Sequence, residues 1–96
     1  MIVQIVDNEI KVEKKSEYLL AAAAFAKDSE LNDAGCLGAE VFTDVEREDH
    51  VYIVQKWESL EAMEKAVADG AFGRHVASLS AAFVTNSTQL LKTVEQ

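Results

Sequence analysis

The sequence predicts an α+β domain with a ferredoxin-like β-α-β-β-α-β order and one antiparallel sheet. Three observations predict it: β-branched, alternating segments lie near both ends and in the middle of the chain, helix-forming segments separate them, and a charged turn joins the two middle strands. A length of 96 residues fits a single domain over positions 1–96. Helices on one side of such a sheet leave its other face uncovered. A second copy of the chain is the simplest cover, so we expect a homodimer.

The first strand is predicted over residues 1–12 (MIVQIVDNEIKV), which are β-branched and roughly alternating. Its even positions, which include Asn8, are expected to face the helices. Val3 and Ile5 make the other face apolar near the N-terminus, as if that half of the sheet were covered on both sides.

The first helix is predicted from Ser16, as its N-cap, to about Asn32, because the segment YLLAAAAFAK is rich in strong helix formers. One side of this helix permits close approach to a sheet. That side carries Tyr18, Ala21, Ala22, Phe25 and Ser29.

Two strands, Cys36–Asp44 and His50–Trp57, flank the turn VERED and are predicted to form a hairpin. Ser59 then caps a second helix to about Asp69, which Gly70 interrupts. A third helical piece follows over residues 71–82, and VTNSTQLLKTVE (84–95) is the predicted last strand. Trp57 is expected to be a packing residue at a strand end.

Composition excludes several functions. The formal net charge of −8 disfavours nucleic acid and anionic membrane surfaces as partners, because both attract clustered Lys and Arg. Met1 leads directly into a strand-like segment rather than a signal peptide, and no apolar run reaches the roughly 18 residues of a membrane span. The single Cys36 excludes an intrachain disulfide and is expected to be buried and unreactive. A cytoplasmic location is therefore expected.

Two polar residues are expected to converge in an apolar cleft. His75 shares a helical stripe with Phe72 and Leu79, and strand parity places Asn8 on the helix-facing side of its strand. A neutral imidazole can accept a proton or ligate iron, and a buried amide needs partners for its donors and acceptor. The alternative for His75 is a histidine at the helix edge that is hydrogen-bonded to backbone or water. For Asn8 the alternative is pairing with the backbone at a bulge. No histidine pair with a carboxylate has metal-binding spacing, so no bare metal site is expected, and His50 is expected to be solvated.

The segments NDAGCLGAEVF (32–42) and VYIVQKWESLEAMEKAV (51–67) closely resemble the antibiotic biosynthesis monooxygenase family, whose members are small dimeric α+β barrels. In its quinol-oxygenase-like branch, two histidines and a glutamate occur where this chain has Ala66, Ala71 and Gln55. Its heme-degrading branch pairs Asn and His, which match Asn8 and His75, with a Trp where Ala66 stands here.

The resemblance implies three functional hypotheses. The first is a monooxygenase that oxidises a small aromatic, quinol-like substrate with O2 and needs no metal or flavin, with His75 as base and Asn8 as polar anchor. The second is heme binding or heme degradation, with His75 as the iron ligand. The third is a non-enzymatic dimeric ligand-binding module. The residues expected to bind the substrate are Tyr18, Phe25, Phe72, Phe83, Gln55 and Arg74.

Overall fold

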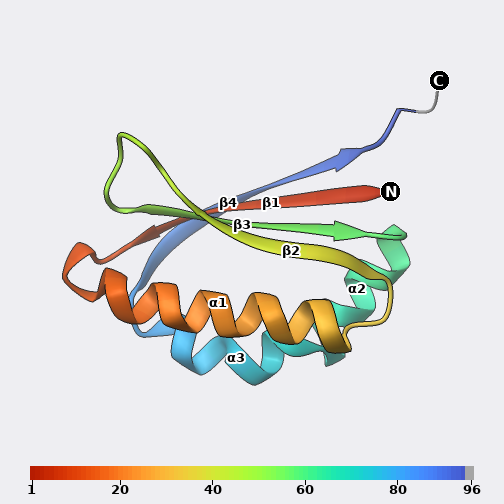
Figure 1. The fold of residues 1–96 in the computed structure, drawn as a ribbon, viewed down its shortest axis with the longest axis horizontal. Coiled ribbons are helices and arrows are strands. Elements are labelled where there is room, and N and C mark those ends of the chain that lie inside the picture. The colour runs from red at the N-terminus through yellow and green to blue at the C-terminus, as the bar shows by residue number, and fades with distance from the viewer. Residues whose placement is uncertain (95–96) are drawn as a thin grey trace.

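The computed structural model describes residues 1–94 and has four antiparallel strands in one sheet, with all helices on one face (Figure 1). The strand order β2-β3-β1-β4 confirms the predicted ferredoxin-like α+β fold. The elements are β1 (Ile2–Ile10), a 3-10 turn (Val12–Lys14), α1 (Lys15–Asn32), β2 (Cys36–Thr43), β3 (His50–Trp57), α2 (Leu60–Asp69), α3 (Ala71–Ser80) and β4 (Phe83–Lys92).

The alternation along β1 determines which residues face the helices. Asn8 and Ile10, at even positions, are buried beneath the helices, as the pattern predicts. In the antiparallel register Asn8 lies opposite Val51 of β3 on one side and opposite Asn86 of β4 on the other. The register therefore brings two asparagines together on the helix-facing side of the sheet.

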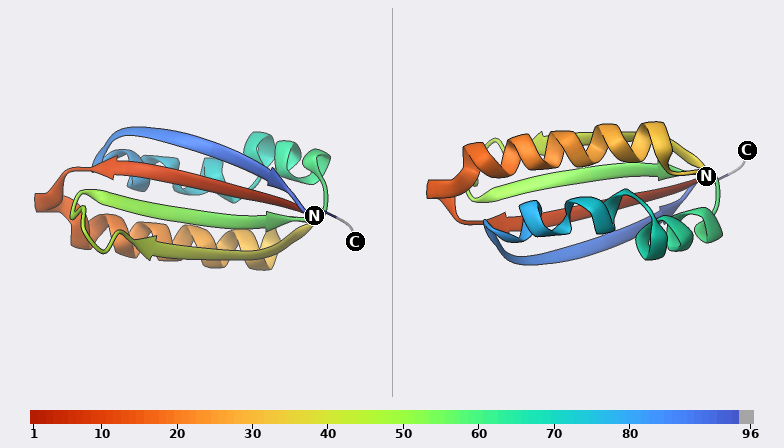
Figure 2. Two further views of the ribbon diagram at one scale, coloured as in Figure 1. Left: turned by 90° about the horizontal axis from the view of Figure 1, so that it is seen from above. Right: turned by 90° about the horizontal axis from the view of Figure 1, so that it is seen from below.

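The helices cover the sheet unevenly. Figure 2 shows α1 along β2 and β3, while α2 and α3 run along the half formed by β1 and β4. The buried side of α1 is the predicted stripe, with Tyr18, Ala22, Phe25 and Ser29 all buried. By contrast, α3 packs mainly against α1 and α2 rather than directly on the strands. Space therefore remains between α3 and the β1–β4 half of the sheet.

Several element ends differ from the sequence pattern. Ser16 is not the N-cap of α1, because the 3-10 turn continues directly into the helix. The helix begins at Lys15, and its N-cap residue, Lys14, makes no side-chain hydrogen bond. Ser59 is a cap as predicted, and its side chain accepts a hydrogen bond from the amide of Ala62. The last strand covers Phe83–Lys92 instead of 84–95, and Glu95 lies outside the described residues.

The sheet face away from the helices is apolar along its middle. Parity places Val3 and Ile5 of β1 on this face, together with Val54 of β3 and the exposed side chains of Phe42 and Leu91. All ten residues of β4 are exposed. These apolar side chains lie among polar ones such as Lys56 and Asp7, and no helix of the described chain covers this face. Among residues 1–94, no helix is long and apolar enough to cross a membrane.

Candidate functional site

Two adjacent pockets lie between the helices and the β1–β4 half of the sheet. The first, the Tyr18 pocket, has a volume of ≈ 230 Å³, and the second, the Gln55 pocket, has a volume of ≈ 180 Å³. Together they fall within the range of about 300–1,000 Å³ that is common for small-molecule sites. They share Phe25, Phe72 and Asn86 as lining residues, and we refer to the two as the cleft.

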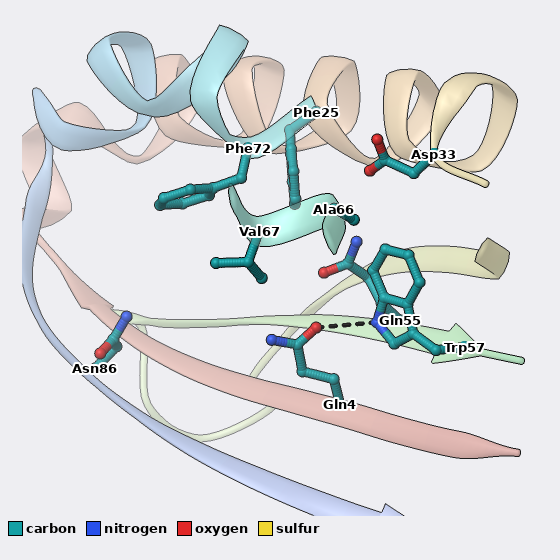
Figure 3. A pocket seen from close by; sticks show the side chains of 9 residues that line it. All are labelled: Gln4, Phe25, Asp33, Gln55, Trp57, Ala66, Val67, Phe72 and Asn86. Atoms are coloured by element: carbon teal, nitrogen blue, oxygen red, sulfur yellow. Dashed lines mark hydrogen bonds between the residues drawn. The ribbon is translucent and has the colours of Figure 1, made fainter. Parts of the chain in front are cut away.

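Aromatic and aliphatic side chains make most of the walls. The Tyr18 pocket is lined by Val6, Asn8, Tyr18, Phe25, Ile53, Phe72, Val76, Leu79, Ser80, Phe83 and Asn86. The Gln55 pocket is lined by Gln4, Phe25, Asp33, Gln55, Trp57, Ala66, Val67, Phe72 and Asn86 (Figure 3). Helical spacing in α1 and α3 and strand parity in β1 and β3 bring these residues to one space. Ala66 of α2 also lines the Gln55 pocket, where its small side chain leaves room.

Asn8 is buried and presents an acceptor to the cleft. Its Nδ2 donates to the carbonyl of Val6 at 3.3 Å and to that of Val51 at 3.2 Å. Because both partners are acceptors only, the amide nitrogen must be on that side and the carboxamide oxygen on the other. No described residue donates to this oxygen. In the described part of the chain, every side-chain nitrogen or oxygen that is fully buried has a hydrogen-bond partner. The Asn8 oxygen has none, so it is not fully buried and must face the open space of the pocket that Asn8 lines.

Tyr18 offers a hydroxyl to the same pocket. The residue is only 2% exposed, and burial raises the pKa of its phenol to about 12. Its hydroxyl makes no hydrogen bond to a side chain or backbone group within residues 1–94. Because every fully buried polar side-chain atom there has a partner, the hydroxyl must be in contact with the open space of the pocket. A buried tyrosine hydroxyl usually has a partner. Here a ligand or water in the pocket is the available one.

A hydrogen-bonded chain of buried side chains supports the Gln55 pocket. Gln55 Nε2 lies 2.8 Å from Ser29 Oγ, and Ser29 Oγ lies 2.8 Å from Asp33 Oδ2. The other carboxylate oxygen of Asp33 accepts from the backbone amide of Ala71 at 3.0 Å, at the first turn of α3. Asp33 therefore joins the end of α1, the start of α3 and the sheet through one side chain.

The cleft has almost no charge. Among the described residues that line it, Asp33 is the one carboxylate, and both of its oxygens already accept hydrogen bonds. No lysine, arginine or histidine of the described chain lines either pocket. Aromatic walls with a few carboxamides and one phenol suit a neutral, flat ligand that carries hydrogen-bonding groups.

The structure does not place His75 in the cleft, which corrects the expectation from the helical stripe. Its Nε2 lies 2.8 Å from a carboxylate oxygen of Asp28 on α1, and its ring packs at 6.1 Å, centroid to centroid, against Phe25. Arg74, expected to bind substrate, makes a two-pronged ion pair with the same carboxylate at 2.9 and 3.0 Å. These bonds hold the pKa of Asp28 well below its usual range, with Arg74 as the largest cause, followed by Asn32 and His75.

His75 lies outside the cleft because α3 faces both the sheet and α1. Phe72, Val76 and Leu79 line the cleft, whereas the adjacent strip of the helix, which includes Ala71 and His75, meets α1. A stripe read from sequence assumes one partner surface. It therefore cannot distinguish the side of α3 that faces the sheet from the side that faces α1.

Other expected positions have mixed outcomes. The structure places Tyr18, Phe25, Phe72, Phe83, Gln55 and Asn8 along the cleft, while their roles in binding remain predictions. Sequence reasoning missed Gln4 and Asn86. Gln4 had a signal, because it is a polar residue on the same strand face as Asn8. Asn86 had none, since only the register of β4 brings it there.

Polar residues also gather on the opposite side of the sheet. His50, expected to be solvated, is largely covered and pairs with Asp7, with 2.6 Å between Nδ1 and the carboxylate. Glu9, Asp49 and His50 bring their ligating atoms within 4.8 Å of one another. This group lies on the face away from the helices and takes no part in the cleft. Cys36, expected to be buried, is half-buried and lies 3.6 Å from Ser29 Oγ.

The residues of the cleft do not fit a heme. Heme iron needs an axial His, Cys, Met or Tyr ligand. Of these types, only Tyr18 lines either pocket among the described residues, and its raised pKa disfavours the phenolate that would bind iron. His75 uses Nε2 on Asp28 outside the cleft.

The chain resembles known proteins in sequence and in fold. A family model described as "Antibiotic biosynthesis monooxygenase" matches residues 1–78. No curated protein matches the chain in sequence.

Solved structures superpose over nearly the whole chain. A crystal structure of an antibiotic biosynthesis monooxygenase has a TM-score of 0.84 at 21% identity, covering 99% of this chain and 100% of its own. A protein from Caulobacter crescentus CB15, named as a candidate antibiotic biosynthesis monooxygenase, has a TM-score of 0.90 at 17% identity, covering 98% and 90%. A conserved protein from Methanosarcina mazei Go1 has a TM-score of 0.84 at 16% identity, covering 98% and 94%. At these identities the likeness establishes the fold.

Proposed function

Because the chain belongs to the antibiotic biosynthesis monooxygenase family, we propose that it is a small monooxygenase that oxidises a neutral, hydroxylated aromatic molecule in the cleft. The observation that supports this most is that aromatic walls surround the Tyr18 hydroxyl and the Asn8 carboxamide oxygen, neither of which has a hydrogen-bond partner among residues 1–94. Two converging polar groups in an apolar pocket are typical of a ligand site. Phe25, Phe72 and Phe83 provide faces against which a flat ring packs.

The chemistry needs no redox group from the protein, since O2 is the oxidant and the substrate supplies all the electrons. A phenol-type substrate loses its hydroxyl proton, passes an electron to O2, and forms a bond from oxygen to the ring carbon opposite the hydroxyl. Loss of water from that adduct leaves a carbonyl. In the balance, the substrate loses its O–H and C–H hydrogens, one atom of O2 becomes the new carbonyl oxygen, and the other leaves as water.

The protein's own residues contribute orientation and electrostatics. The phenol of Tyr18, which stays protonated because burial raises its pKa to about 12, donates to the oxygen on which negative charge develops. The Asn8 oxygen accepts from a hydroxyl of the incoming substrate. The apolar walls exclude water, which strengthens both hydrogen bonds.

No histidine of the described chain lines the cleft to accept the hydroxyl proton of the substrate. His75 lies outside the cleft, and Asp33 is occupied by Ser29 and Ala71. The proton therefore passes to water at the open side of the cleft. The rate should then rise with pH until the substrate's own hydroxyl is ionised, rather than follow a histidine of ordinary pKa.

A homodimer is part of the proposal. The apolar side chains of Val3, Ile5 and Val54 on the open sheet face, and the exposed strand β4, support a second copy of this chain as the cover. The two sheets would then meet face to face. The one cysteine of the chain, Cys36, is free, which fits the reducing environment of a cytoplasmic protein.

Oxygen uptake with a panel of mono- and dihydroxynaphthalenes tests the proposed function. Tyr18→Phe should lower kcat on the order of 10²-fold, as expected for the loss of one preorganised donor to a developing oxyanion. Tyr52→Phe is the matched control, because its hydroxyl bonds to Asp44 outside the cleft. It should keep wild-type activity, as should His75→Ala.

A binding module without turnover is the second candidate, favoured by the lack of a free base in the cleft. Saturable binding of the same compounds without oxygen uptake would select it. An activity that His75→Ala abolishes and Tyr18→Phe spares would contradict the assignment of roles.

A further inference from the structure

Two glutamines face each other across neighbouring strands in the Gln55 pocket, and their surroundings fix which end of each carboxamide meets a ligand. Gln4 of β1 and Gln55 of β3 are register partners. The oxygen and nitrogen of an amide are hard to distinguish by shape, so their orientation has to be argued from the partners. Here each glutamine has a partner whose chemistry permits one orientation only.

Gln4 is oriented by a group that can only donate. The indole Nε1 of Trp57 lies 3.0 Å from the side-chain oxygen of Gln4. Because an indole N–H cannot accept a hydrogen bond, the Gln4 oxygen must face it and the NH2 group must point elsewhere. Figure 3 shows this nitrogen on the side of the pocket away from Trp57.

Gln55 is oriented by a chain that ends on a group that can only accept. Ser29 Oγ donates its hydrogen to Asp33 Oδ2 at 2.8 Å, so the Ser29 oxygen is left to accept. The Gln55 NH2 donates to that oxygen at 2.8 Å, and its carboxamide oxygen is turned away from Ser29, toward the pocket. Gln55 is only 5% exposed, yet no described residue donates to this oxygen, which therefore meets the open space of the pocket.

From this geometry we infer that Gln4 and Gln55 form a donor–acceptor pair that selects a neutral hydroxyl group on the ligand. This deepens the proposed function and rests on it, since it names the group that one end of the substrate must carry. A single hydroxyl satisfies both glutamines, because it accepts from the Gln4 NH2 and donates to the Gln55 oxygen. A carbonyl, an ether or a phenolate has no hydrogen to give, and it leaves the Gln55 oxygen without a partner.

The pair also assigns the two ends of the cleft different tasks. A phenolate would face the Gln55 oxygen unfavourably, so the hydroxyl at this end stays protonated and anchors the ring. The group that ionises and reacts lies toward Tyr18, whose hydroxyl can donate to a negative oxygen. Ser29 is a positioning residue, because it acts on the ligand only through Gln55, and Asp33 helps to position Gln55 through Ser29.

Trp57 is the only tryptophan of the chain and lines this pocket, so its fluorescence reports binding without any turnover. A naphthol and its O-methyl ether are titrated under anaerobic conditions, which separates binding from oxidation. Wild type should bind the naphthol about tenfold or more tightly than the ether, because the ether leaves a buried acceptor unpaired. Gln55→Leu should reduce that ratio more than any other cleft variant, leaving only the preference for a hydroxyl that the Asn8 oxygen gives.

Ser29→Ala tests the orientation itself, and it covers the case in which Gln55→Leu does not fold. Without the Ser29 hydroxyl the Gln55 carboxamide can turn over, and the ratio should fall several-fold while circular dichroism stays native. Ser78→Ala, an exposed serine on α3, should leave the ratio unchanged. Equal affinity of wild type for both compounds, or a ratio that neither cleft variant changes, would overturn the inference. Failure of both compounds to bind would instead count against the cleft as a site.

Discussion

Gly70 joins α2 to α3, and its replacement by alanine should destabilise the protein through side-chain crowding rather than backbone strain. Its φ of −101° is open to any residue. A Cβ at this position, however, would overlap a carboxylate oxygen of Asp33 and lie 2.6 Å from the carbonyl oxygen of Ala66. The Asp33 oxygen that would have to move is the one that accepts from the amide of Ala71. The substitution should therefore break the first turn of α3 and loosen the chain through Ser29 to Gln55.

The magnitude follows from two costs. Overpacking typically costs about 1–3 kcal/mol, and a buried amide without a partner costs a further ~1–3 kcal/mol. A total of roughly 2–6 kcal/mol would lower Tm by about 10 °C or more in a domain of this size. Thermal unfolding at fixed protein concentration measures it, since a dimer makes Tm depend on concentration.

Gly73→Ala is the matched control for that experiment. Gly73 lies two positions into α3, and a Cβ there meets nothing within 4 Å. Alanine should stabilise this helix by up to about 1 kcal/mol because it has the better helix propensity. If Gly70→Ala proved as harmless as Gly73→Ala, the role given to Asp33 as the link between α3 and the cleft would be wrong.

Other expected results follow from the same structure. Because the pKa of Tyr18 is raised to about 12, its contribution to stability should be complete below pH 10 and lost as pH rises through 12, and Tyr18→Phe should remove this loss in alkaline denaturation. Asp28, whose pKa is held low chiefly by Arg74, should stabilise the fold above pH 4 and lose that effect as pH falls, so the stability difference between Asp28→Asn and wild type should shrink in acid. Sedimentation should give about twice the 10.5 kDa chain mass for wild type, and Ile5→Asp should give a monomer; a monomeric wild type would exclude the proposed dimer. Thiol labelling of native Cys36 should be slow, and rapid stoichiometric labelling would contradict the expectation that it is unreactive.

The sequence pattern predicted burial best in β1 and α1. The two-residue alternation of β1 placed Asn8 under the helices, and the helical stripe of α1 placed Tyr18 and Phe25 in the core. Gly70 and Ser59 were correctly predicted as the limits of α2, because their effects are local. These features depend only on nearby residues.

The sequence pattern predicted side-chain placement least well where contacts between distant segments determine it. His75 turned to Asp28 because α3 lies against α1 as well as above the sheet. Asn86 joins the cleft only through the pairing of β4 with β1. The donor–acceptor orientation of Gln4 and Gln55 depends on partners, Trp57 and Ser29, that are distant in sequence. No local pattern encodes such contacts.

The claim that the cleft is an oxygenase site is tested most directly by supplying ¹⁸O2 with a hydroxynaphthalene and analysing the product by mass spectrometry. Wild type should yield a carbonyl product that contains one ¹⁸O atom, with the second ¹⁸O in water, and Tyr18→Phe should reduce the yield on the order of 10²-fold. Product oxygen derived from water, or the same labelled yield from Tyr18→Phe as from wild type, would contradict the account.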